Sequence, residues 1–177
     1  MPVACLGWGS LIWKAGDLPV AGSWHHDGPH LPIEFCRTSD GGELATAICL
    51  NAPPVPVLWA RLTTDDLTEA CALLRQREGI PAQRVDGVGM LRVTAQMPGA
   101  LAEWARQRGL DALIWTALPP KFGHTEGLIP TAAQAVSYLQ QLQGEQAVHA
   151  RTYILQTPEQ IDTPYRRTIT AQLGWDR

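Results

Sequence analysis

The sequence predicts an α+β fold in which a mixed, barrel-like β-sheet is flanked by α-helices. The predicted strands come in clusters and do not alternate strictly with helices, a pattern that favours α+β over a doubly wound parallel sheet. The short strands are numerous enough to close a sheet, and closure would remove its exposed edges. The length of 177 residues fits one domain with a sizeable core, so we expect a single domain over residues 1–177.

The predicted strands are short apolar runs that carry β-branched or aromatic residues and are bounded by Gly, Pro, Asp or Asn. They are Val3–Gly7, Ile33–Ser39, Ala45–Leu50, Val55–Leu62, Gly89–Ala95, Ala112–Ala117 and Ala150–Gln156. The segment Ala15–Pro32 has little periodicity and many Gly, Pro and His residues. We expect this segment to be a long loop.

Helices are predicted where residues that start or stop a helix flank an apolar stripe. Ser and Thr cap a helix start, proline fits the first turn, and glycine follows the last turn. The signals in chain order are Thr63 or Thr64 before a helix to about Arg77, Pro98 and Gly109 around a second helix, Thr131 with Gln134 as a capping box, and Thr163-Pro164 before a helix to about Leu173.

Composition and charge exclude several classes of function. Hydrophobic residues make up 45% of the chain and charged residues 18%, with a formal charge of −3 and a pI near 5.9. This balance argues against an electrostatically driven nucleic-acid binder. No apolar run approaches the length that spans a bilayer, and no signal sequence is visible at the N-terminus. We therefore expect a cytoplasmic protein that binds neither nucleic acid nor membrane.

The cysteines and histidines give no clear metal or redox motif. The cysteines (Cys5, Cys36, Cys49 and Cys71) lack CxxC spacing, so we expect reduced, small core residues. A thiol nucleophile at Cys5 would need a nearby base, and its local sequence offers none. His25, His26, Asp27 and His30 lie within six residues and could hold a metal. Gly28-Pro29 interrupts them, so a polar loop without a metal is favoured.

Some polar residues near predicted strand ends have two interpretations. Lys121 or His124 could contact an acidic substrate group, or could belong to an ordinary surface loop. Arg37 and Arg61 could face a substrate carboxylate, or could be the outward residues of alternating strands. We favour the second interpretation for the arginines, because charged side chains are seldom buried without a partner.

Glu78 extends the apolar stripe of the first predicted helix. The stripe consists of Leu67, Ala70, Cys71 and Leu74, at spacing i, i+3, i+4, i+7. Glu78 continues it at the helix end, just before Gly79. A carboxylate on a buried face has a raised pKa, which suits proton transfer near neutral pH. Alternatively, the last turn points Glu78 into water or pairs it with Arg84 or Arg92, and periodicity alone favours this alternative.

The segments "GWGSLIW" and "LLRQREG" together resemble the γ-glutamylcyclotransferase family, in particular its ChaC-like branch. That family carries a Tyr-Gly-Ser loop after its first strand and a glutamate after a helix, often as Arg-Glu. The matching positions here are Trp8-Gly9-Ser10 and Arg77-Glu78. The match covers Val3–Trp13 and about Leu58–Gly79. "VLWARL" and "IPTAAQAVSYLQQL" are also similar to the family's layout.

The resemblance implies a γ-glutamylcyclotransferase-like fold and an activity on γ-glutamyl compounds, in the area of glutathione metabolism. Such enzymes release 5-oxoproline when the substrate's α-amino group attacks its own γ-carbonyl, without a metal or organic cofactor. The implied general acid/base is Glu78. The implied substrate-binding residues form the loop Gly7, Trp8, Gly9, Ser10 and Leu11, because a glycine-rich turn exposes backbone N–H donors to the carbonyl oxygen and α-carboxylate.

Two positions differ from the family pattern, and other functions stay open. Trp8 stands where the family has tyrosine, and "GIPAQRV" follows Glu78 where the family has Gly-Tyr. The chain could be a binding module for an amino-acid-like ligand on the same scaffold, for which the altered Trp8 is the support. It could also hydrolyse or transfer γ-glutamyl amides. The sequence specifies neither the leaving group nor the oligomeric state.

Overall fold

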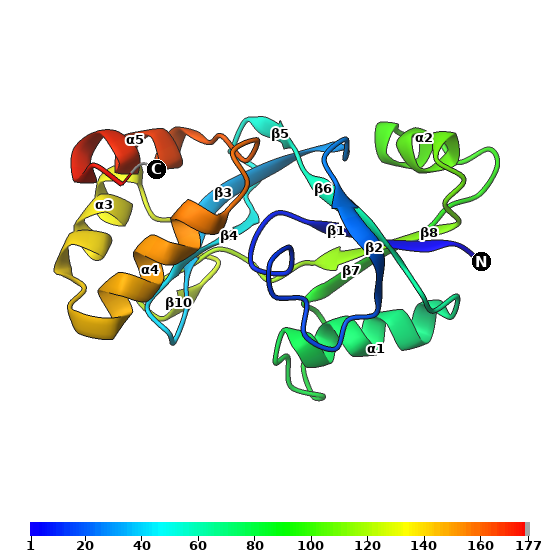
Figure 1. Ribbon diagram of the computed structural model, residues 1–177, viewed down its shortest axis with the longest axis horizontal. Helices are drawn as coiled ribbons and strands as arrows, with labels where there is room; N and C mark the ends of the chain where they lie inside the picture. Colours follow the sequence, from blue (N-terminus) through cyan, green and yellow to red (C-terminus); the bar gives the residue numbers. More distant parts are fainter. Residues whose placement is uncertain (176–177) are drawn as a thin grey trace. The chain divides into compact units, whose positions relative to one another are not determined.

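The computed structural model describes residues 1–175 of the chain, which form two compact units (Figure 1). Unit 1 contains the segments Met1–Gly7, Lys14–Pro29 and Pro56–Leu118. Unit 2 contains Trp8–Trp13, His30–Val55 and the chain from Pro119 onward. A single domain can contain more than one compact unit, so one domain over residues 1–177 stays a prediction.

Unit 1 is built on a mixed five-stranded sheet in the order β2-β6-β1-β8-β7. Its strands are β1 (Val3–Gly7), β2 (Val20–His25), β6 (Leu58–Leu62), β7 (Val88–Arg92) and β8 (Ala112–Thr116). The central strand β1 pairs antiparallel with β6 and parallel with β8. The described chain combines five helices with a curled mixed sheet that forms a half-barrel, so the mixed α+β class is confirmed. The γ-glutamylcyclotransferase-like fold stays a prediction.

Helices α1 (Leu67–Arg77) and α2 (Ala100–Gln107) lie on opposite faces of this sheet (Figure 1). Side chains of a strand alternate between its two faces. Cys5 is paired with Ile114 and lies close to Cys71 of α1, so this face carries α1. The next residue of β1 is paired with Trp59 of β6, so Trp59 points to the opposite face. The centroid of the Trp59 ring lies 5.4 Å from that of Trp104 in α2, so the opposite face carries α2. All five residues of β1 are buried, as expected for a strand covered on both faces.

Unit 2 is a second mixed sheet with three helices. Its strands run in the order β10-β9-β3-β4, and β5 also pairs with β3. The strands are β3 (His30–Thr38), β4 (Leu44–Ile48), β5 (Pro54–Pro56), β9 (Lys121–Phe122) and β10 (Thr125–Glu126). The helices are α3 (Ala132–Gln141), α4 (Gly144–Gln156) and α5 (Pro164–Leu173).

A buried carboxylate fixes the start of α5 to β3. Glu34 is 2% exposed, and its two carboxylate oxygens accept hydrogen bonds from the backbone N–H groups of Phe35 and Tyr165. Burial raises the pKa of Glu34, although bonds from Thr163 and these amides act in the opposite direction. The Glu34 carboxylate therefore accepts a hydrogen bond from the backbone at the N-terminus of α5, where a negative charge is favourable.

The predicted strand Ala150–Gln156 is wrong, because these residues form the second half of α4. The run contains the strand-favouring residues Thr152, Tyr153 and Ile154, which explains the error. Its buried residues are Ala150, Tyr153 and Ile154. Their spacing of three and four is that of a helix face, and a short apolar run does not separate the two structures by periodicity alone.

Two further predictions are corrected by backbone hydrogen bonding. The segment Ala15–Pro32 is not a loop, because it contains β2 and the start of β3. Its many small and polar residues hid the strand, which has no fully buried residue. The predicted strand Val55–Leu62 is two strands, β5 and β6, which are separated by Val57. The N–H of Val57 leaves the ladder and donates to the carbonyl of Pro29 at 3.0 Å.

The predicted helix signals are confirmed at two starts and corrected at two others. Thr131 and Gln134 form the capping box, and Thr163 caps α5 with a proline in its first turn. The α1 cap is Asp66, not Thr63 or Thr64. Helix α2 begins after Gly99, so its predicted proline lies outside it. The cysteines are free thiols. Three of them are buried as predicted, whereas Cys71 is only partly buried. Within residues 1–175, no helix is long and apolar enough to cross a membrane.

Replacement of Asp66 by alanine tests the cap of α1. Its carboxylate accepts hydrogen bonds from the backbone N–H groups of Thr68 and Glu69, so Asp66→Ala should lower the free energy of unfolding by about 1 kcal/mol in urea denaturation. The exposed Thr63 makes no such contact, and Thr63→Ala should change this free energy by less than about 0.5 kcal/mol. A larger loss in Thr63→Ala than in Asp66→Ala would contradict the assignment of the cap.

Candidate functional site

Glu78 lies at the end of α1, where a tight turn fixes its direction. The N–H of Gly79 donates to the carbonyl of Gln76, and that of Ile80 donates to Arg75. These two bonds form a Schellman motif, in which the residue after the cap adopts a left-handed conformation. Gly79 has φ +66°, a conformation that glycine adopts without steric strain. The helix therefore stops immediately after Glu78.

The Glu78 carboxylate is paired with its neighbour. Arg77 Nη1 lies 2.8 Å from Glu78 Oε1, and the two side chains are 15% and 14% exposed. The Arg77 guanidinium also donates to the carbonyl of Lys14. The ion pair favours the ionised carboxylate, which is the form that accepts a proton. The sequence suggested Arg84 and Arg92 as partners of Glu78. Arg84 pairs with Asp86, and Arg92 donates to the sulfur of Met1.

The charge of Glu78 acts on Cys5, in the middle of β1. Burial raises the pKa of the Cys5 thiol strongly, and the negative charge of Glu78 raises it further. The carboxylate therefore lies on the α1 face of the sheet, close to Cys5. The same effect keeps Cys5 protonated, and a protonated thiol is a poor nucleophile. The sequence-based view that Cys5 is not a nucleophile is consistent with this environment.

The carboxyl ends of β1 and β8 meet at one edge of the unit 1 sheet, because the two strands are parallel. β1 ends at Gly7 and β8 at Thr116. A Cβ on Gly87 would lie 2.9 Å from Ile80 and 3.3 Å from Leu118, so the chain that leaves α1 packs beside the end of β8. Gly7, Thr116 and the segment after Glu78 thus share this edge, the kind of place where α/β sheets bind ligands.

The rest of the predicted loop, Trp8 to Leu11, belongs to unit 2. Trp8 and Leu11 are 4% and 6% exposed. Thr46 Oγ1 donates to the carbonyl of Trp8 at 3.2 Å, and lies 2.9 Å from Tyr153 Oη. Either hydroxyl can be the donor in this pair, and Tyr153 Oη also accepts a hydrogen bond from the Thr46 N–H at 3.1 Å. This network fixes the loop against β4 and α4.

Gly9 is a glycine because two hydroxyl groups approach its α-carbon. A Cβ at this position would lie 2.4 Å from Tyr153 Oη and 2.5 Å from Thr46 Oγ1. Neither Thr46 nor Tyr153 was predicted from the sequence to lie at this loop. The helical spacing of Ala150, Tyr153 and Ile154 could have indicated that Tyr153 faces the core. This segment was instead predicted to be a strand.

The side chains of His25 and Asp27 contact other residues of unit 1. Asp27 accepts from Trp59 Nε1 at 2.8 Å and pairs with Arg108 at 3.1 Å, and these bonds lower the pKa of its carboxyl, the Trp59 bond most. His25 stacks on Trp59 with ring centroids 4.4 Å apart. Across residues 1–175, no group of three or more His, Cys, Asp and Glu side chains could hold a metal. The two bonds of Asp27 connect the segment after β2 with Trp59 and with Arg108, which follows α2.

Of the remaining predicted polar residues, Arg37 and Arg61 have partners within the chain, and Lys121 and His124 lie on or beside β9. Arg37 donates to the carbonyl of Pro119 at 2.9 Å and pairs with Glu126 at 3.1 Å. Lys121 lies on β9 next to Arg37. His124 lies in the turn between β9 and β10, with φ +66°. The guanidinium of Arg61, an exposed residue, lies over the Trp59 ring, in line with the prediction that it points outward.

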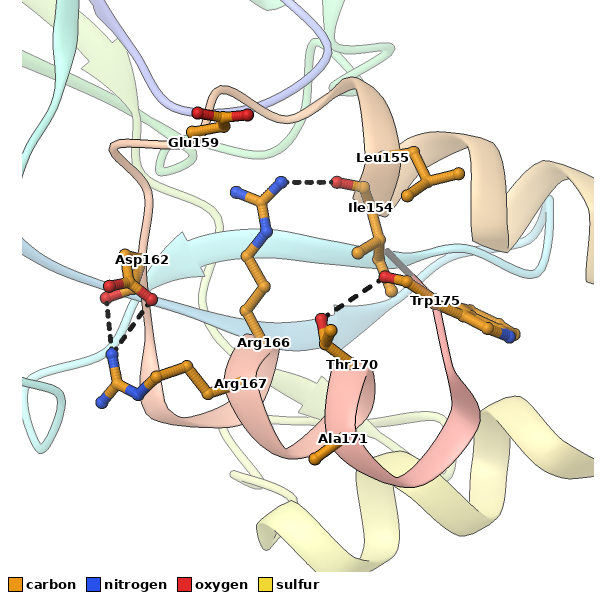
Figure 2. Close-up of a pocket in the computed structure, with 9 residues that line it drawn as sticks. All are labelled: Ile154, Leu155, Glu159, Asp162, Arg166, Arg167, Thr170, Ala171 and Trp175. Carbon is orange, nitrogen blue, oxygen red and sulfur yellow. Dashed lines mark hydrogen bonds and ion pairs between the residues drawn. The ribbon is translucent and has the colours of Figure 1, made fainter. Parts of the chain in front are cut away.

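A pocket of about 510 Å³ lies in unit 2, between the end of α4 and α5 (Figure 2). Figure 2 shows Arg167 paired with Asp162, and Thr170 bonded to the carbonyl of Trp175. Arg166 donates to carbonyl groups at the end of α4 and in the following turn, which are those of Ile154, Thr157, Pro158 and Ile161. These polar groups stabilise the helix ends, and no predicted site residue lines the pocket.

Comparison with known proteins found no matching family model, no matching curated protein and no matching solved structure. The resemblance to the γ-glutamylcyclotransferases therefore rests on the two short sequence segments. Within unit 1, Gly7 and the segment after Glu78 lie at one sheet edge, and Thr116 joins them. The part played by Trp8, Gly9, Ser10 and Leu11 in substrate binding stays a prediction.

The packing around Gly9 can be tested by adding a methyl group. Gly9→Ala should lower the free energy of unfolding by roughly 1–3 kcal/mol, because the new Cβ overlaps two hydroxyl groups. The loss should shrink by more than about 0.5 kcal/mol in a Thr46→Ala/Tyr153→Phe background, where both hydroxyls are absent. Urea denaturation of the four proteins measures this. An equal loss in both backgrounds would contradict the account.

Proposed function

We propose that this chain is a cofactor-free γ-glutamyl cyclotransferase with a γ-glutamylcyclotransferase-like fold. It releases 5-oxoproline from a γ-glutamyl peptide or amine, and Glu78 is its general acid/base. The single observation that carries the proposal is that Glu78, at the end of α1, is a mostly buried carboxylate held in an ion pair with Arg77. Buried carboxylates held by a charged partner are typical of functional sites.

The reaction needs one group that accepts a proton and later returns it. The α-ammonium of the substrate gives a proton to the Glu78 carboxylate, and the resulting amine attacks the γ-carbonyl carbon. The new C–N bond closes the five-membered ring, and the carbonyl oxygen becomes negatively charged. The bond to the leaving nitrogen then breaks while Glu78 returns the proton to that nitrogen. The ring nitrogen still carries a second proton, which passes to the freed Glu78 carboxylate and from there to the departing amine, which leaves as an ammonium ion. The products are 5-oxoproline and the released amine.

The remaining residues have supporting roles in this proposal. Arg77 holds the carboxylate in place, because its guanidinium is itself fixed on the carbonyl of Lys14. Gly7 leaves the end of β1 without a side chain, so that a substrate can approach the backbone. The loop of Trp8, Gly9, Ser10 and Leu11 is proposed to supply backbone N–H donors to the γ-glutamyl group.

Replacement of Glu78 by glutamine tests the proposal. The wild type should release 5-oxoproline from a panel of glutathione, a γ-glutamyl amino acid and a γ-glutamyl amine. Glu78→Gln should lower kcat by about 10²- to 10⁴-fold, because the amide cannot accept the proton. Mass spectrometry identifies the product, and circular dichroism checks that each variant is folded.

Glu69→Gln is a matched control, because Glu69 lies on the same helix but in its first turn. Its activity should equal that of the wild type. Equal release of 5-oxoproline by wild type and Glu78→Gln would overturn the role of Glu78. Release of glutamate would indicate hydrolysis, and a ligand-dependent rise in Tm without any turnover would indicate a binding module.

A further inference from the structure

The hydroxyl of Thr116 is buried and has no hydrogen-bond partner among the described residues 1–175. The residue as a whole is only partly buried, at the last position of β8. Nearly all buried polar atoms in folded proteins have a partner, so each exception needs an explanation. A ligand group that binds at this position would be such a partner.

Strand register places Thr116 on the α1 face of the sheet. Ile114 is paired with Cys5, and neighbouring residues in register point to the same face. Thr116 lies two residues further along β8, so its side chain points to this face as well. Cys5 is the residue whose thiol is close to Glu78. The hydroxyl and the carboxylate therefore occupy the same face.

A second set of contacts places Glu78 near the same end of β8. Thr116 is paired with Val88, and the N–H of Ala117 donates to the carbonyl of Gly87 at 2.8 Å. Gly87 packs against Ile80, which is two residues after Glu78. Both register and packing thus bring the end of α1 to the strand end that carries Thr116.

We infer that Thr116 is a substrate-binding residue whose hydroxyl donates a hydrogen bond to the α-carboxylate of the γ-glutamyl group. The inference rests on the proposed function of Glu78. The α-amine and the α-carboxylate are attached to one carbon atom, so a substrate whose amine meets Glu78 places its carboxylate beside the same sheet edge. A hydroxyl bonded to a carboxylate is a strong, charge-assisted pair. Rotation about χ1 between staggered positions presents the hydroxyl to the ligand.

The first test measures stability without a ligand. Thr116→Val replaces the hydroxyl by a methyl group of similar size, so its Tm should equal or exceed that of the wild type. Ser39 is a matched control in unit 2, because its hydroxyl is also buried and unpartnered. Ser39→Ala should likewise keep or raise Tm. A clear fall in Tm for Thr116→Val would mean that the hydroxyl bonds within the chain, and would overturn the inference.

The second test separates the carboxylate from the rest of the ligand. Titration calorimetry compares 5-oxoproline with 2-pyrrolidinone, which has the same ring without the carboxylate. Thr116→Val should weaken binding of 5-oxoproline by about 10- to 100-fold and leave 2-pyrrolidinone unaffected. In turnover assays the variant should raise KM by a similar factor with a much smaller change in kcat. Thr116→Ser should restore both values, and Ser39→Ala should match the wild type.

The outcomes distinguish a failure of the role of Thr116 from a failure of the proposed function. Loss of turnover in Glu78→Gln together with unchanged KM and affinity in Thr116→Val would overturn the role of Thr116 alone. An equal loss of affinity for both ring compounds would overturn its assignment to the carboxylate. A wild type that neither turns over γ-glutamyl compounds nor binds 5-oxoproline would overturn the proposed function, and the inference with it.

Discussion

The candidate site depends on the ion pair between Arg77 and Glu78. A carboxylate that is 14% exposed loses most of its hydration, and an unpaired charge in that position would destabilise the fold. Arg77 provides the compensating charge, and the backbone carbonyl of Lys14 fixes the guanidinium. The turn at Gly79 completes the arrangement, because it ends α1 where the carboxylate still points toward β1.

The parallel pairing of β1 and β8 gives this carboxylate its chemical setting. Parallel strands bring their carboxyl ends to one edge, and here the ends are a glycine and a threonine. Glycine leaves the backbone open to a ligand, and Thr116 adds a hydroxyl that no group in the described chain satisfies. In the proposed reaction, Glu78 acts as the base, the open backbone at Gly7 lets the substrate approach, and Thr116 supplies a hydrogen-bond donor.

Part of this site could be predicted from the sequence, because local patterns determined it. The strand Val3–Gly7 was predicted with its observed bounds. The stripe from Leu67 placed Glu78 on its line at the helix end, although periodicity alone favoured a Glu78 that points into water or pairs with Arg84 or Arg92. The partner of Glu78 could not be predicted. On an ideal helix Arg77 points to the side, so the periodicity of α1 did not predict that it pairs with Glu78.

The features that the sequence did not reveal depend on tertiary contacts. Tyr153 lies in a run of strand-favouring residues, and packing against the sheet of unit 2 makes this run a helix. The unpartnered state of Thr116 is a property of strand register, which a single sequence does not specify. The same holds for Gly9, because the sequence marks it as a turn glycine but does not name the two hydroxyl groups that require it.

The most direct test of the central claim is a crystal structure of the protein with 5-oxoproline bound. The account predicts that the lactam nitrogen lies within hydrogen-bond distance of the Glu78 carboxylate, at the sheet edge formed by Gly7 and Thr116. A product molecule seated away from Glu78, for example in the pocket between α4 and α5, would contradict the account.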